Sequence, residues 1–215
     1  MNIRIALSTR QSGLLVALIL GSALVLTGCQ GGGEPVTDPT STSATPTVTA
    51  TSTPTTTAAY KPADASGKAQ NVPVPVKPAL ADENSKEGLE AFTKYWYEAL
   101  GYAYETGDLT YTQEITGENC GLCTTAVGVV RSWYQDGGWI AGGKFTVPTV
   151  EITFTPAPDG NYQALAQVIQ SDIHTYMPDG TEPNPAALST NLALLLMATH
   201  QDGQWKANDV VNVNG

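Results

Sequence analysis

The 215-residue chain has few of the side chains from which catalytic and metal sites are built. Its histidines are His174 and His200, so acid–base catalysis by an imidazole has two candidates. It has three cysteines, and no second pair of cysteines or histidines stands at metal-ligand spacing. A glycine-rich phosphate loop, a nucleophile elbow and a paired-carboxylate motif are absent. The sequence therefore predicts no metal and no cofactor, and an enzyme is the less favoured interpretation.

Basic side chains are also scarce. Residues 82–215 carry seventeen acidic side chains against five basic ones, a net charge of −12. A domain with this charge is repelled by phosphate backbones and by anionic lipid headgroups. We therefore expect no nucleic-acid partner and no contact of the domain itself with a membrane surface, although solubility alone would favour the same charge.

The apolar run near the start of the chain is too short to span a bilayer. It covers 14–26, against the roughly 20 residues that a span requires. Arg4 and Arg10 precede it, and Leu26-Thr27-Gly28-Cys29 follows it. This arrangement is typical of a bacterial lipoprotein signal with cleavage before Cys29. An uncleaved signal anchor is the alternative, but it would not require a cysteine here.

Residues 1–28 are thus predicted to be a signal peptide, and Cys29 the lipidation site. A diacylglyceryl group on its thiol and an acyl chain such as palmitate on its amino group would place at least two chains in the bilayer, enough for stable anchoring. The protein would then be lipid-anchored at the extracytoplasmic face of the cell membrane.

Two linker segments follow the anchor. Residues 29–60 are rich in Thr, Pro and Gly and poor in large apolar side chains, which predicts a disordered stalk, either O-glycosylated or bare. Residues 61–81 are rich in Pro and Val and favour an extended segment that can lie against a folded neighbour.

Residues 82–215 are predicted to form one domain with its helices first. Apolar side chains recur every three or four residues from Leu89 to Ala103, which predicts a helix capped by Asn84, with Glu87 reaching back, and ended by Gly107. Tyrosines between them either pack as core or line a cavity. A second main helix is expected from near Asn119 to 137–138.

The rest of the domain has strand patterns. Strands are expected at 145–154, with Pro148 at a bulge or sheet edge, and at 162–176. Residues 188–199 and 205–213 are expected to form a hairpin through a type I′ turn at Asp202-Gly203.

The predicted fold is therefore α+β, with N-terminal helices packed on a curved antiparallel sheet of about four strands. This order resembles the cone of the nuclear-transport-factor-2-like superfamily. The motifs LTGC, VPVPVKP, EGLEAFTKYWYEALGYAYETGD, CGLC and YQDGGWIAGG resemble an uncharacterised family of actinobacterial lipoproteins over most of residues 72–145. The resemblance implies an envelope location and supplies no catalytic residue.

Cys120-Gly121-Leu122-Cys123 is the motif in the domain whose spacing carries chemistry. Cysteines three apart at a helix start can form a disulfide, and outside the cytoplasm oxidation is the default. We expect a structural disulfide between Cys120 and Cys123, with a redox-active dithiol as the alternative. The motif does not follow a strand as it does in thioredoxin-like folds.

A second chemical candidate is the pair Asp172 and His174, which would share one face of the strand at 162–176 and could abstract a proton inside a cone. The alternative is a solvated strand face. The candidates for ligand binding are Trp96, Trp133 and Trp139, whose rings would either line a cavity or close it by packing.

Residues 193–198 are apolar on both faces of their strand, although a sheet over helices needs one apolar face. A homodimer partner, an envelope protein or the chain's own segment 72–78 could cover the second face, or neighbouring side chains could merely shade it. The function predicted from the sequence is binding or scaffolding by a tethered acidic domain. The alternative is a cone-fold enzyme acting on a small molecule, or a thiol-redox protein.

Overall fold

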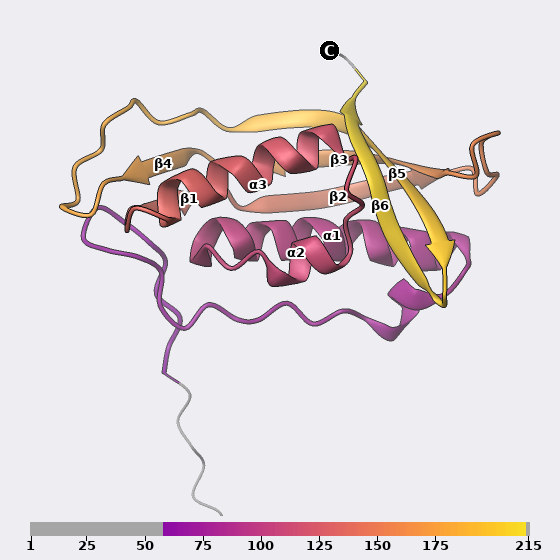
Figure 1. Cartoon of the computed structure of the whole chain (residues 1–215), viewed down its shortest axis with the longest axis horizontal. Helices are drawn as coiled ribbons and strands as arrows, with labels where there is room; N and C mark the ends of the chain where they lie inside the picture. Colours follow the sequence, from indigo (N-terminus) through magenta and orange to yellow (C-terminus); the bar gives the residue numbers. More distant parts are fainter. Residues whose placement is uncertain (1–57, 214–215) are drawn as a thin grey trace, which may run out of the picture. The chain divides into compact units, whose positions relative to one another are not determined.

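The computed structural model describes residues 58–213, in which helices pack on one face of a four-stranded antiparallel sheet (Figure 1). The predicted signal peptide (1–28), Cys29 and the predicted stalk as far as residue 57 lie outside the described residues. The elements in chain order are η1 (Ala79–Asp82), α1 (Lys86–Thr106), α2 (Thr110–Glu114), α3 (Gly121–Tyr134), β1 (Trp139–Gly142), β2 (Phe145–Ile152), β3 (Tyr162–Gln170), β4 (Ile173–Tyr176), β5 (Thr190–Gln201) and β6 (Gln204–Asn212).

Helix α1 is the long amphipathic helix that the sequence predicts. The predicted cap, Asn84, is wrong by one residue: the hydroxyl of Ser85 accepts the hydrogen bond from the Gly88 amide at 3.0 Å. Ser85 has the extended backbone that a cap requires, so its short side chain can reach the amide three residues on. Gly107 ends the helix at φ +80°, a conformation that costs glycine little.

The core lies between α1 and the sheet. Leu89, Phe92 and Trp96 on α1 are at most 1% exposed, as are Leu196 and Val210 on the strands that face them. Segment η1 and helix α2 pack on other sides of α1. Because the helix is covered on more than one side, tyrosines outside its main apolar stripe are also buried.

The main sheet has the strand order β2-β3-β5-β6, with every neighbouring pair antiparallel. Strands β5 and β6 form the predicted hairpin: Asp202 and Gly203 both have positive φ, as a type I′ turn requires. The register of β2 shifts between Thr146 and Thr149, around Pro148, which confirms the predicted bulge. Figure 1 shows β5 bending along its length, so that the hairpin crosses α1 steeply. The predicted fold class, α+β with helices on a curved antiparallel sheet of four strands, is confirmed.

The strand predicted over 162–176 is wrong in one respect, because it is divided into β3 and β4, which belong to different sheets. Strand β4 pairs with β1, a strand that the sequence did not indicate. Gly142 and Gly143 both adopt positive φ, and the Gly143 amide donates to the Asp172 carbonyl at 2.9 Å. The Lys144 amide donates to the Ser171 hydroxyl at 3.0 Å. These contacts join the link between β1 and β2 to the link between β3 and β4. At both links the backbone leaves one sheet and enters the other.

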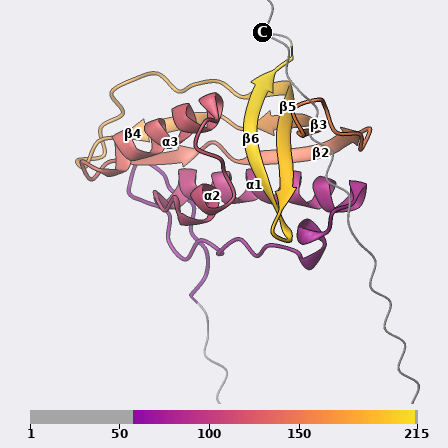
Figure 2. The same ribbon diagram turned by 45° about the vertical axis from the view of Figure 1, so that its right-hand side comes forward.

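The segment before η1 lies along α1 (Figure 2). Its residues 61 and 70 pair through two backbone hydrogen bonds, and the Trp139 indole donates to the Asp64 carbonyl at 2.9 Å. Ala81 is fully buried. Folded contacts therefore begin before residue 82, and residues 72 and 73 lie beside α1, where they line a pocket, rather than over the second face of β5.

Among residues 58–213, no helix combines the length and the apolar character that crossing a membrane would need.

Candidate ligand pockets

The inner pocket is a cavity of about 180 Å³ between α1, α3 and the sheet. Its walls are mainly apolar and aromatic, with a few amide and hydroxyl side chains. Its lining includes Tyr97, Tyr104, Ala126, Phe145, Leu192 and Leu194. A mostly apolar cavity with a few polar groups is the usual form of a small-molecule site.

Tyr97, on α1, is the unusual residue of this wall. Its side chain is 2% exposed, and its hydroxyl has no hydrogen-bond partner within residues 58–213. Burial raises the pKa of the Tyr97 phenol, so the group is neutral at physiological pH. A buried hydroxyl without a partner costs free energy, because it has lost its hydrogen bonds to water. Tyr97 therefore contributes to the wall of the inner pocket, and its buried hydroxyl has no partner within residues 58–213.

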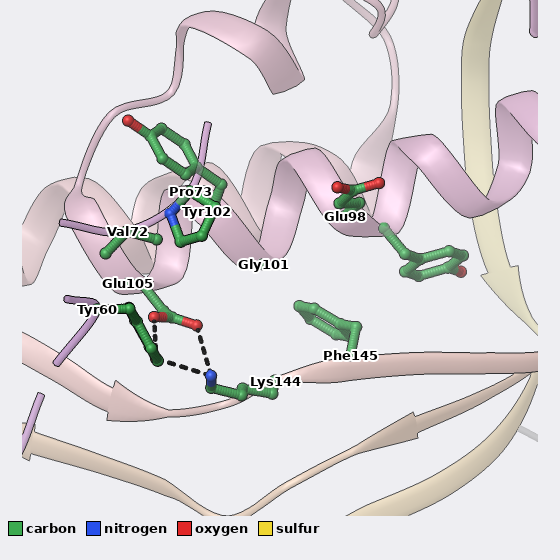
Figure 3. A pocket seen from close by; sticks show the side chains of 10 residues that line it. Tyr60, Val72, Pro73, Glu98, Gly101, Tyr102, Glu105, Lys144 and Phe145 are labelled. Carbon is green, nitrogen blue, oxygen red and sulfur yellow. Dashed lines mark hydrogen bonds and ion pairs between the residues drawn. The ribbon is translucent and has the colours of Figure 1, made fainter. Parts of the chain in front are cut away.

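The outer pocket has a volume of about 230 Å³ and lies between α1, the start of β2 and the segment before η1, called the N-terminal segment below (Figure 3). The N-terminal segment contributes Tyr60, Val72 and Pro73, and α1 contributes Glu98, Gly101, Tyr102 and Glu105. Phe145 is the first residue of β2, and Lys144 directly precedes it. Tyr97 and Phe145 line both pockets, so these two side chains separate the outer pocket from the inner one.

Three side chains at one end of the outer pocket bind one another. The Tyr60 hydroxyl donates to Glu105 Oε2 at 2.7 Å and accepts from Lys144 Nζ at 2.7 Å. Lys144 Nζ also lies 3.2 Å from Glu105 Oε1. The hydrogen bond with Tyr60 raises the pKa of Lys144, and burial raises the pKa of Tyr60. This cluster fastens the N-terminal segment to α1 and to the start of β2.

Cys120 and Cys123 are joined by a disulfide at the start of α3. Cys120 is the residue that caps this helix, and its sulfur accepts the Cys123 amide at 3.3 Å. Both residues are at most 2% exposed. An attacking thiolate must reach a sulfur to exchange it, so burial favours the structural role over the redox role.

The structure does not pair Asp172 with His174. The His174 ring instead lies 2.8 Å from Glu182 Oε1, and Asp172 Oδ1 accepts the Ser189 amide at 2.6 Å. The pairing was inferred from one continuous strand, and the break at 171–172 removes that basis. Both the His174 and Glu182 side chains are about one-third exposed or more, so this is a surface ion pair when the ring is protonated.

The three tryptophans do not gather at one site. Trp96 is fully buried in the main core and donates to the Thr116 hydroxyl at 2.9 Å. Trp139 stacks on Tyr176 in a second, smaller cluster, with ring centroids 5.6 Å apart. Trp133 is partly buried against the main core. None of the three lines the inner or the outer pocket, which tyrosines and Phe145 line instead.

The second face of β5 stays partly open. Leu165, Leu195 and Val211 form one row across β3, β5 and β6, and each is half-buried. Met197 lies next to this row and is also half-buried. Over residues 58–213, no group of three or more His, Cys, Asp or Glu side chains has the arrangement of a metal site.

The comparisons with known proteins give a family and a fold without an activity. A family of unknown function (DUF6318) matches residues 58–211. No curated protein matches the chain. Similar solved structures include the intermembrane space region of the chloroplast protein ARC6, with 12% identity, a TM-score of 0.42, and coverage of 60% of this chain and 95% of that one.

Two further similar structures are described as having a cystatin-like fold. One is an uncharacterised protein from Caulobacter vibrioides, with 19% identity, a TM-score of 0.39, and coverage of 59% of this chain and 88% of that one. The other is a domain of unknown function from Nostoc punctiforme, with 14% identity, a TM-score of 0.38, and coverage of 61% and 80%. At these TM-scores the similarities carry no conclusion about function.

Proposed function

Because the chain belongs to the DUF6318 family of unknown function, we propose its function from the site itself: a lipid-anchored envelope protein whose domain binds a small, mostly apolar ligand in the inner pocket. The observation that carries this proposal is the mainly apolar pocket whose wall includes Tyr97, a residue with an unpaired buried hydroxyl. Binding is favoured over catalysis because Asp172 and His174 are held by other partners outside this pocket.

The size of the inner pocket limits the ligand. An apolar cavity of about 150 Å³ holds benzene, so a cavity of about 180 Å³ suits a single substituted ring or a short branched chain. The apolar walls favour such a ligand by excluding water from its surface. A hydroxyl or carbonyl oxygen on the ligand would accept the hydrogen bond that Tyr97 does not make within residues 58–213.

The experiment compares phenol with toluene, which have similar shapes and differ in one hydroxyl. We expect both to bind in NMR titrations of the full-length protein in a nonionic detergent, with phenol the tighter. The variant Ala126→Leu adds a larger side chain to the pocket wall and should abolish both titrations. Ala91→Leu, outside the pocket, should leave them unchanged. Equal titrations with the wild type and Ala126→Leu would contradict the proposal.

The anchor is supported by the LTGC motif, the short apolar run before it and the Thr/Pro-rich segment after it. It places the protein at the extracytoplasmic face of the cell membrane, where oxidation of Cys120 and Cys123 is expected. The test is Cys29→Ser: the wild-type protein should incorporate a palmitate analogue and sediment with membranes. The variant should keep its precursor mass and incorporate none. Labelling of the variant equal to that of the wild type would refute the anchor.

A further inference from the structure

The outer pocket has chemistry that the inner pocket lacks. Two carboxylates, Glu98 and Glu105, line it together with one ammonium group, that of Lys144. Glu105 accepts a hydrogen bond from Tyr60 and forms an ion pair with Lys144. Glu98 has no ion pair within residues 58–213. The pocket therefore has a net negative charge, and its uncompensated charge lies at the Glu98 end.

Four aromatic rings also line this pocket: Tyr60, Tyr97, Tyr102 and Phe145. A cation within about 6 Å of an aromatic ring centroid is attracted by the electrons of the ring face. The protein already makes one such contact here, since Lys144 Nζ lies 4.7 Å from the centroid of the Tyr60 ring. Tyr102 is steadied by a T-shaped contact with Tyr111 at 5.4 Å, so its ring is held in place.

The two carboxylates are too far apart on the helix for one lysine to neutralise both. Glu98 and Glu105 are seven residues apart, which corresponds to about 10 Å along the axis of α1. Figure 3 shows Lys144 turned toward Glu105 and Tyr60, with Glu98 and Phe145 away from that cluster. Lys94, one helical turn before Glu98, is paired with Glu90 at 2.7 Å, so Glu98 has no ion pair among the described residues.

Gly101 stands between these two carboxylates in the middle of α1. Glycine in a helix interior costs about 1 kcal/mol relative to alanine. Packing does not require it here, because a Cβ at this position would meet only Phe145 Cδ2, at an ordinary contact distance of 3.7 Å. Because Gly101 has no side chain, the pocket stays open between Glu98 and Glu105.

We propose that the outer pocket is a binding site for the ammonium group of a small organic cation, which Glu98 neutralises and the rings of Tyr102 and Phe145 contact. The acidic domain around it, with a net charge of −12 over residues 82–215, raises the local concentration of such cations. The outer pocket shares the side chains of Tyr97 and Phe145 with the inner pocket, but Glu98 and Tyr102 line the outer pocket and not the inner one, so their variants test this proposal apart from the proposed function.

The experiment uses choline and its uncharged isostere 3,3-dimethyl-1-butanol, titrated by NMR into the full-length protein in a nonionic detergent. Choline should bind in the millimolar range and the isostere at least several-fold more weakly. Glu98→Gln should weaken choline binding about threefold, as expected for loss of an ion pair with an exposed carboxylate. Tyr102→Leu should weaken it about threefold, in line with one partly exposed cation–π contact.

Two further variants separate binding from general damage to the fold. Lys144→Gln removes the competing internal cation and should strengthen choline binding about threefold, a gain that misfolding does not produce. Gly101→Leu should improve the helix while filling the pocket, so it should abolish binding without lowering thermal stability. Glu87→Gln, which makes the same change in charge on α1 outside the pocket, should bind choline like the wild type.

Equal affinities for choline and its isostere would overturn the proposal, because the pocket would then select for shape alone. Unchanged choline binding in Glu98→Gln or Gly101→Leu would overturn it as well. If the wild-type protein binds phenol but not choline, the proposal for the outer pocket is wrong and the proposed function of the inner pocket is unaffected.

Discussion

Replacing Tyr97 by phenylalanine should stabilise the protein. The Tyr97 ring is 2% exposed and packs edge-to-face on Trp96 at 4.9 Å, and phenylalanine keeps this contact. Only the hydroxyl is removed, and it has no partner within residues 58–213. A buried polar group left without a hydrogen bond costs about 1 to 3 kcal/mol. We therefore expect Tyr97→Phe to raise the free energy of unfolding by about 1 kcal/mol or more.

The assay is urea unfolding followed by tryptophan fluorescence. Tyr134→Phe is the matched control, since the Tyr134 hydroxyl donates to the Tyr104 carbonyl at 2.8 Å. Its removal should lower the free energy of unfolding by about 1 kcal/mol, the usual net value of such a bond. Tyr97→Phe should also weaken phenol binding and leave toluene binding unchanged. A loss of stability in Tyr97→Phe as large as in Tyr134→Phe would refute the reasoning, because it would mean that the Tyr97 hydroxyl has a partner.

Three other outcomes are expected. Replacing Cys120 and Cys123 together by alanine should lower the free energy of unfolding by about 2 kcal/mol, the chain-entropy value for so short a loop; urea midpoints equal to the wild type would contradict this. Leu196→Ala should cost about 2 to 5 kcal/mol, whereas Leu195→Ala, half-exposed on the other face, should cost under about 1 kcal/mol in the same assay. Burial raises the pKa of Tyr134 to about 12. The Tyr134 phenol therefore ionises at lower pH in the unfolded chain than in the folded one, so the free energy of unfolding should be constant below pH 10 and fall between pH 10 and 12. A pH series of thermal unfolding measures this, and Tyr134→Phe should reduce the fall.

The elements that the sequence predicted well are those whose signals are local. Helix α1 has a sustained apolar period and a terminal glycine, and the hairpin of β5 and β6 has an Asp-Gly turn between two alternating strands. The division between β3 and β4, in contrast, depends on residues that are distant in the sequence. Residues 162–176 have the composition of one strand throughout, and the break depends on Gly142 and Gly143, which lie about thirty residues earlier in the chain.

The outer pocket could not have been assembled from the sequence for the same reason. Its cluster joins Tyr60 to Glu105, 45 residues away, and to Lys144, 84 residues away. Tyr60 lies in a segment without periodicity, which composition places in the linker. One local signal was present: a glycine in the middle of a strong helix, flanked by Glu98 and Glu105 at three and four residues. Helical geometry places Glu98, Gly101 and Glu105 on one face of α1, and Gly101 has no side chain there.

Each outer margin of the four-stranded sheet has a feature that hinders the addition of a further strand. At the β2 margin, Pro148 has no amide hydrogen to offer, and the bulge beside it bends the backbone out of line. At the β6 margin, the Ala207 amide and carbonyl are already bonded to Ile115 and Gly117. Each of these features interrupts the row of backbone groups that a second copy of the sheet would have to pair with, and so opposes aggregation by strand pairing at these margins.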